Sequence, residues 1–81
     1  MYFVYILKSL KDGTFYTGLT NNIERRVREH DNGKYKESYS INHKPFKLVY
    51  FEELPSRIEA RKREKYWKSG TGRDVRDTLY K

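Results

Sequence analysis

Residues 2–20 read YFVYILKSLKDGTFYTGLT, with a strand-like run on each side of a turn sequence. The first run, Tyr2–Lys8, is apolar on both alternating faces, which predicts a strand covered on both sides. Asp12-Gly13 favours a tight turn, and Thr14–Leu19 is predicted as the returning strand. The predicted sheet therefore begins with a hairpin.

A helix is predicted after this hairpin. Asn21 or Asn22 can cap it, it runs to about His30, and Asn32-Gly33 is its stop signal. Residues 34–44 are polar and rich in hydroxyl groups, which is typical of a surface loop.

Phe46–Phe51 is predicted as a third strand. Phe46, Leu48 and Tyr50 occupy alternate positions in it, so these three side chains are expected on one face.

Ser56 and Glu59 match the capping box of a second helix, which runs to about Lys68. Residues 71–81 are predicted to add one short helix as a C-terminal extension. The order β-β-α-β-α predicts a small α/β (α+β) fold, a three-stranded sheet flanked by helices, with its core at about 2–68. With 81 residues, the chain is expected to form this domain alone.

The charge balance is strongly basic. Eighteen Lys and Arg residues against eleven Asp and Glu give a net charge of +7. This favours a polyanionic partner, either nucleic acid or an acidic membrane surface. The alternative is a soluble protein whose basic face is simply solvated.

The chain contains no cysteine, which excludes a disulfide framework and a thiolate zinc site. Its first apolar run is too short to span a bilayer and lacks the features of a signal peptide. A cytoplasmic protein is therefore expected.

The predicted hairpin brings the phenols of Tyr5 and Tyr16 close together. In the first predicted helix, Arg26 and His30 stand one turn apart, within an arc of about 100° that also contains the apolar Val27. Side chains there could reach over the sheet edge toward the tyrosines. The alternative is a snorkelling arginine and a half-buried histidine.

The second predicted helix has a carboxylate beside its packing residues. Ala60, Glu64 and Trp67 lie on one face, and Ala60 and Trp67 are its plausible buried residues. A carboxylate between them is costly unless a cation neutralises it. That cation is either a basic side chain or a divalent metal held by oxygen ligands and phosphate.

Several fragments resemble one known family in their order and spacing. They are VYIL at 4–7, FYTGLT at 15–20, IERRVREH at 23–30, KLVY at 47–50, and Glu59-Ala60 followed by Arg63-Glu64 and Lys68. Together they resemble the GIY-YIG nucleases, in particular small stand-alone members related to the N-terminal nuclease domain of the bacterial excision-repair subunit. The resemblance implies a β-β-α-β-α core and phosphodiester hydrolysis at a single metal ion.

The resemblance also assigns residues to the site. Tyr5 and Tyr16 match the tyrosines of the first and second motifs, Arg26 and His30 match the arginine and histidine of the first helix, and Glu64 matches the metal-binding glutamate. Three features differ from the family pattern: Phe3 replaces the first glycine, the second motif reads Tyr-Thr-Gly, and the asparagine of some larger members has no clear match.

The roles expected from this resemblance follow the needs of the reaction. Glu64 would hold one Mg²⁺ or Mn²⁺, and Arg26 would bind a phosphate oxygen. Tyr5 is the candidate general base, with His30 accepting or relaying its proton. Tyr16 would position the water or the phosphate, although the roles of the two phenols could be exchanged.

Two further groups of residues are expected near the substrate. Gly18 either allows backbone or substrate to approach closely or is simply a strand-end glycine, and the two explanations are about equally good. Basic residues on the second helix are expected to bind phosphates without reading sequence, and they are Arg57, Arg61, Lys62, Lys65 and Lys68.

The sequence thus predicts a metal-dependent DNA endonuclease, with RNA as the alternative nucleic acid and a targeting protein as a further partner. A second hypothesis is a nucleic-acid-binding module that has the nuclease fold but little activity without a partner. A third is a structural interaction domain whose charge only solvates it.

Overall fold

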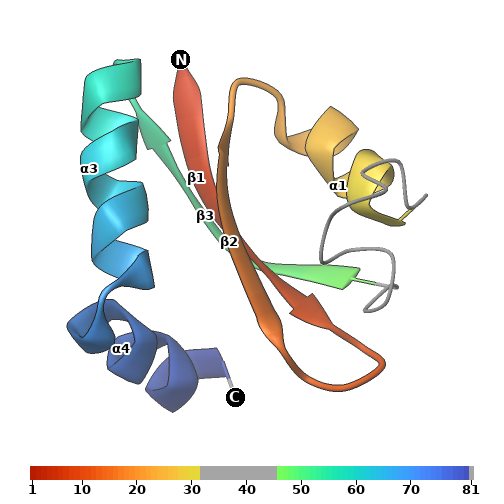
Figure 1. The fold of residues 1–81 in the computed structure, drawn as a ribbon. Coiled ribbons are helices and arrows are strands. Elements are labelled where there is room, and N and C mark those ends of the chain that lie inside the picture. The colour runs from red at the N-terminus through yellow and green to blue at the C-terminus, as the bar shows by residue number, and fades with distance from the viewer. Residues whose placement is uncertain (32–45, 81) are drawn as a thin grey trace.

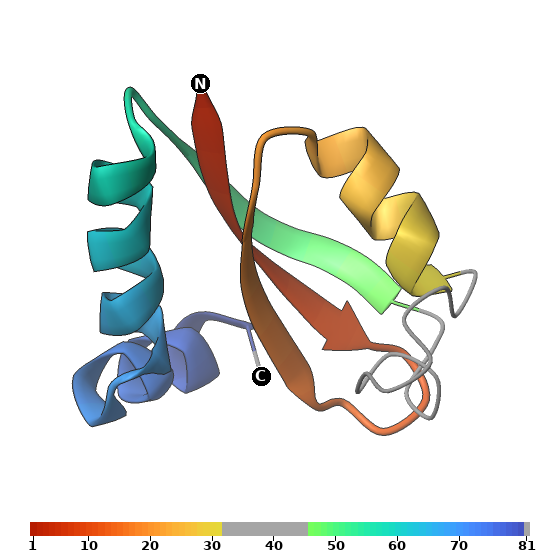
Figure 2. The same ribbon diagram turned by 45° about the horizontal axis from the view of Figure 1, so that its top comes forward.

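The computed structural model describes residues 1–31 and 46–80 (Figures 1 and 2). Its elements are β1 (Tyr2–Ser9), β2 (Phe15–Thr20), α1 (Ile23–Asp31), β3 (Phe46–Leu54), α3 (Arg57–Lys68) and α4 (Gly70–Tyr80). The described residues form a three-stranded antiparallel sheet, which confirms the predicted α+β fold class. The helix α4 is the short C-terminal helix predicted at 71–81.

β1 is the central strand, in the sheet order β2-β1-β3. Val4 and Ile6 point to one face and Tyr5 and Leu7 to the other, and all four are buried. The prediction of a strand covered on both sides is therefore confirmed. The two faces become two small hydrophobic cores.

The hairpin between β1 and β2 closes at the predicted turn. The backbone N–H of Ser9 donates to the carbonyl of Thr14 at 2.8 Å, and that of Gly13 donates to the carbonyl of Ser9 at 2.9 Å. Gly13 has φ +76°, a left-handed conformation that favours glycine. The Asp12 carboxylate accepts from the Thr14 N–H and hydroxyl, which holds the turn.

The helices cover opposite faces of the sheet (Figure 1). α1 packs Ile23 and Val27 against the core that contains Tyr5 and Leu7. α3 and α4 lie on the other face, where Ala60 and Trp67 are buried against Val4 and Ile6. Across the described residues, none of the helices has the length and apolar character needed to cross a bilayer.

The predicted helix starts are confirmed in atomic detail. Asn22 caps α1, because its side-chain oxygen accepts from the N–H of Arg25 at 3.0 Å. Ser56 caps α3, because its hydroxyl accepts from the N–H of Glu59 at 3.3 Å. The predicted surface loop at 34–44 lies outside the described residues.

The prediction for the third strand needs a correction. β3 continues to Leu54, three residues beyond the predicted end, and its pairing with β1 shifts register between Ile6 and Leu7. This irregularity switches the alternation, so Leu48 belongs to the α1 face and Tyr50 to the α3 face. The sequence prediction assumed an uninterrupted period of two residues, which puts Leu48 and Tyr50 on the same face.

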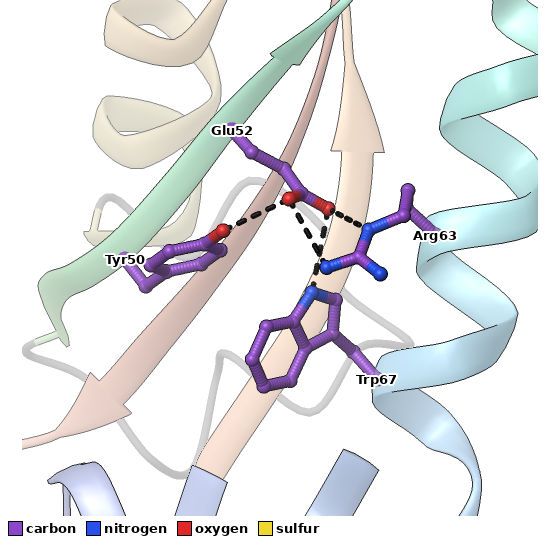
Figure 3. Close-up of polar contacts among 4 residues, drawn as sticks. All are labelled: Tyr50, Glu52, Arg63 and Trp67. Carbon is purple, nitrogen blue, oxygen red and sulfur yellow. Dashed lines mark hydrogen bonds and ion pairs between the residues drawn. The ribbon is translucent and has the colours of Figure 1, made fainter. Parts of the chain in front are cut away.

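The register shift also turns Glu52 toward α3, where it forms the polar network in Figure 3. Its carboxylate accepts from the Tyr50 hydroxyl at 2.8 Å, from Arg63 Nε at 2.7 Å and from Trp67 Nε1 at 3.4 Å. Burial alone would raise the pKa of Glu52, but the hydrogen bonds from Arg63 and Tyr50 outweigh it and lower the pKa below its usual value. The network ties β3 to α3.

Replacing Glu52 by Gln should lower the free energy of unfolding at neutral pH by about 1–2 kcal/mol, because Arg63 loses its carboxylate partner. Since the folded pKa of Glu52 is depressed, its contribution is present above the unfolded value of 4.5 and is lost as pH falls through the folded value. The difference between wild type and E52Q should therefore shrink on acidification. Urea unfolding from neutral to acidic pH measures it.

Glu53→Gln is the matched control, because Glu53 is the exposed neighbour on the same strand. It should change the stability by no more than about 0.5 kcal/mol. Equal losses in E52Q and E53Q would contradict the role of the network.

Candidate active site

The two motif tyrosines lie side by side on the face of the sheet that α1 covers. Tyr5 comes from β1 and Tyr16 from β2, and their rings stack with centroids 6.3 Å apart and planes inclined by 29°. Tyr5 is only 1% exposed, whereas Tyr16 is half-buried. The hairpin therefore produces the predicted pair, with one phenol inside and one near the surface.

Gly18 is paired with Tyr5 across the strands and makes room for its ring. A Cβ at position 18 would lie 2.5 Å from Cζ of Tyr5 and still closer to its hydroxyl oxygen, so the Tyr5 ring would have to shift. The close approach at Gly18 differs from the one expected. The group that approaches is the Tyr5 phenol rather than backbone or substrate.

Arg26 lies on α1, on the same side of the sheet as the tyrosines. It is half-buried, and its Nε is shielded from solvent. Its position follows from the packing of Ile23 and Val27, which presses α1 onto the tyrosine face. His30 belongs to the last turn of α1, but its side chain lies outside the described residues, so its role stays a prediction.

Glu64 comes from the opposite layer, on α3. Ala60 and Trp67 mark the buried stripe of this helix, and Arg63 lies on the flank that bonds to β3. At about 100° per residue, Glu64 falls on the other flank, toward β2. Its side chain is 21% exposed, and Lys68 Nζ lies 3.3 Å from its carboxylate. A basic side chain therefore lies close enough to neutralise the Glu64 carboxylate.

The two layers meet at β2, which is an edge strand of the sheet. Beside it lies a groove of about 200 Å³ that Tyr16 and Lys68 both line. Tyr16 lines the groove and also stacks on Tyr5. Lys68 lines the same groove and forms an ion pair with Glu64. The helices that carry the predicted site residues, α1 and α3, lie on opposite faces of the sheet (Figure 2).

The basic residues predicted on α3 separate into two groups. All are exposed, and four are spaced so that they form a stripe within about 80° next to Glu64: Arg57, Arg61, Lys65 and Lys68. Lys62 lies outside this stripe and forms an ion pair with Glu59 at 3.8 Å. The stripe continues the positive charge of the groove along the helix.

Sequence reasoning missed two arginines of α4. Arg73 and Arg76 line the groove opposite Tyr16. Their spacing of three residues within the predicted C-terminal helix placed them on one face, which is a usable signal. The sequence did not show that this face turns toward β2, because that depends on how α4 packs.

The donors present fit a metal held by one protein carboxylate. Among the described residues no group of three or more His, Cys, Asp or Glu side chains could hold an ion together. Glu64 offers a partly exposed carboxylate beside Lys68, an oxygen donor of the kind that Mg²⁺ and Mn²⁺ prefer. Water and phosphate oxygens would complete such a site, because Mg²⁺ commonly keeps several waters.

Comparison with known proteins shows which family the chain matches. The GIY-YIG catalytic domain matches residues 1–77. The chain is 48% identical to a UPF0213 protein of Clostridium perfringens over 71 residues, covering 88% of this chain and 74% of the relative. It is 47% identical to a UPF0213 protein of Syntrophus aciditrophicus over 62 residues, covering 76% and 70% of the two chains.

A solved structure is similar to the whole chain. The solution NMR structure of the UPF0213 protein BH0048 from Bacillus halodurans superposes with a TM-score of 0.55 and is 36% identical in sequence. The similarity covers 98% of this chain and 85% of the other. It therefore includes α4 as well as the predicted core.

Gly18→Ala should displace the Tyr5 ring and lower the free energy of unfolding by about 1–3 kcal/mol, because the added methyl overlaps the phenol. Chemical denaturation and the aromatic NMR shifts of Tyr5 and Tyr16 measure both effects. Gly70→Ala is the control, since nothing lies within 4 Å of a Cβ there. Equal stability of the two variants would show that Tyr5 does not need the glycine.

Proposed function

Since this chain belongs to the GIY-YIG catalytic domain family, we propose that it is a metal-dependent endonuclease that hydrolyses phosphodiester bonds in DNA. The family implies a nuclease-type fold and a nucleic acid substrate. The observation that supports the proposal best is that Tyr16 and Lys68 both line one groove beside β2 and that Lys68 is paired with Glu64. The net charge of +7 suits a polyanionic substrate.

The burial of the tyrosines favours an exchange of their expected roles. Hydrolysis requires a group that contacts the attacking water, and Tyr5 is almost completely enclosed. Tyr16 is only half-buried, so its hydroxyl is the better candidate to bind and deprotonate the attacking water. Tyr5 then acts as a positioning residue, because its ring stacks on Tyr16 and is held over Gly18.

Glu64 is the proposed ligand of one Mg²⁺ or Mn²⁺. When bound, such an ion would act as a Lewis acid on the phosphate and stabilise the leaving oxygen. Lys68 already holds the Glu64 carboxylate at 3.3 Å, so it would have to give up this contact. The released ammonium group would then be available for a phosphate oxygen in the same groove.

Arg26 and His30 are proposed for the remaining tasks. The guanidinium of Arg26 would bind a non-bridging phosphate oxygen through its fixed fork of donors. His30, one turn further along α1, would accept the proton from the tyrosine, since an imidazole titrates near neutral pH. Both assignments rest on the family motif and on the side of the sheet that α1 covers.

A nucleic-acid-binding module is the second candidate function. The exposed stripe of Arg57, Arg61, Lys65 and Lys68 could bind a phosphate backbone without any cleavage. The internal ion pair between Lys68 and Glu64 also favours this alternative, because it occupies the only carboxylate proposed for the metal.

Glu64→Gln tests the proposed function directly. Wild-type protein should cut at least one member of a panel of branched, nicked and duplex DNA and single-stranded RNA in Mg²⁺, and EDTA should stop it. E64Q should lose at least about a hundredfold in rate, because the metal loses its protein ligand. Glu53→Gln, a matched change far from the groove, should cut normally. Binding without any metal-dependent cutting would support the binding module instead.

Paired tyrosine variants separate the two phenols. Tyr16→Phe should reduce the cleavage rate by about a hundredfold or more, because it removes the hydroxyl proposed as general base. Tyr5→Phe keeps the stacked ring and should cost about tenfold or less. Single-turnover kinetics at saturating DNA measure both. A larger loss of rate in Tyr5→Phe than in Tyr16→Phe would identify Tyr5 as the general base.

A further inference from the structure

We propose that the groove between β2 and α4 binds a backbone phosphate adjacent to the one that is cleaved, with Arg73 as its main contact. This inference rests on the proposed function and extends it to a second substrate subsite. The residues that line the groove are Phe15, Tyr16, Thr17, Trp67, Lys68, Arg73 and Arg76. They include three cations and no carboxylate.

The three cations differ in how much charge they can offer a ligand. Lys68 is paired with Glu64 at 3.3 Å, and Arg76 with Asp77 at 3.0 Å. Arg73 is exposed, and among the residues that the structure describes it has no acidic partner. The uncompensated charge of the groove therefore comes from Arg73.

The groove lies where a DNA strand bound at the proposed active site would continue. Tyr16 lines it from the sheet, and Lys68 lines it from α3 and contacts Glu64. If a metal bound to Glu64 held the phosphate that is cleaved, the next phosphate of the same DNA strand could reach this groove, which Arg73 lines. A concave site also concentrates the field of its cations more than an open helix face does.

The fold holds α4 firmly enough to form this groove before any ligand binds. Gly72 lets α4 approach the end of α3 closely, because a Cβ there would lie 2.7 Å from the Cα of Trp67. At the other end of α4, Lys8 Nζ donates to the carbonyl of Tyr80 at 3.1 Å. Such preorganisation lowers the entropy cost of binding.

Arg76 is the anchor of the groove rather than its ligand-binding charge. Its guanidinium lies 4.4 Å from the centroid of the Phe15 ring and also bonds to Asp77. It thereby packs α4 onto β2 while its charge is largely compensated. Arg73, one turn earlier on the same helix, is exposed to solvent.

The test is the affinity for a short fluorescein-labelled single-stranded DNA in EDTA, measured by anisotropy at several salt concentrations. Arg73→Gln should weaken binding about fivefold and reduce the slope of log K against log salt by about 0.7, as expected for one lost phosphate contact. Arg73→Lys should recover part of the affinity, because it keeps the charge. The control Lys47→Gln removes one charge from exposed β3 and should bind like wild type.

Equal affinity and salt slope in R73Q and K47Q would overturn the inference. Because binding in EDTA requires no cleavage, a weakened R73Q supports the groove even if the wild type fails to cut in Mg²⁺. That failure would contradict only the proposed endonuclease. A wild type that cuts, together with an R73Q variant of unchanged affinity, would contradict only the groove.

Discussion

The carboxylate of Glu52 sets the orientation of α3, on which the rest of the candidate site depends. It joins β3 to the helix through Arg63 and Trp67, and its short bond to Arg63 Nε is charge-assisted. Because this bond holds one flank of α3 on β3, the other flank, with Glu64, faces β2. A network whose members all have partners can define one arrangement of a small core. In this chain the same network stabilises the fold and fixes the direction in which α3 presents Glu64, the proposed metal ligand.

The candidate site is built around an edge strand rather than inside a deep cavity. β1 is buried on both faces, so it contributes Tyr5 to one core and Val4 and Ile6 to the other. A domain of this size has little interior to spare, and Tyr5 is both a core residue and the support of Tyr16. Because β2 is an edge strand, a substrate bound beside it could contact residues from the helices on both faces of the sheet.

The excess positive charge serves several different purposes. Arg63 and Arg76 are used mainly by the fold, because each bonds to a carboxylate and lies over an aromatic ring. Arg57, Arg61 and Lys65 of the exposed α3 stripe, together with Arg73, form no ion pair among the described residues, so their charge is available to a partner. Lys68 stands between the two groups, since it neutralises Glu64 and lines the groove. Net charge alone therefore overstates how much of the basic surface is available to nucleic acid.

The sequence by itself determined the helices and strands and suggested the residue types of the candidate site, because turns, caps and apolar periods are local. Asp12-Gly13, Asn22 and Ser56 mark boundaries through hydrogen bonds a few residues away, and the stripe of Ala60 and Trp67 is a property of one helix. Only the tertiary structure decided the features that rest on contacts between distant segments. These features are the face switch in β3, the burial of Tyr5 below Tyr16, the flank of α3 that carries Glu64, and the docking of α4 that brings Arg73 to β2. Local patterns cannot specify them, because each follows from how one packed element restricts the rotation of another.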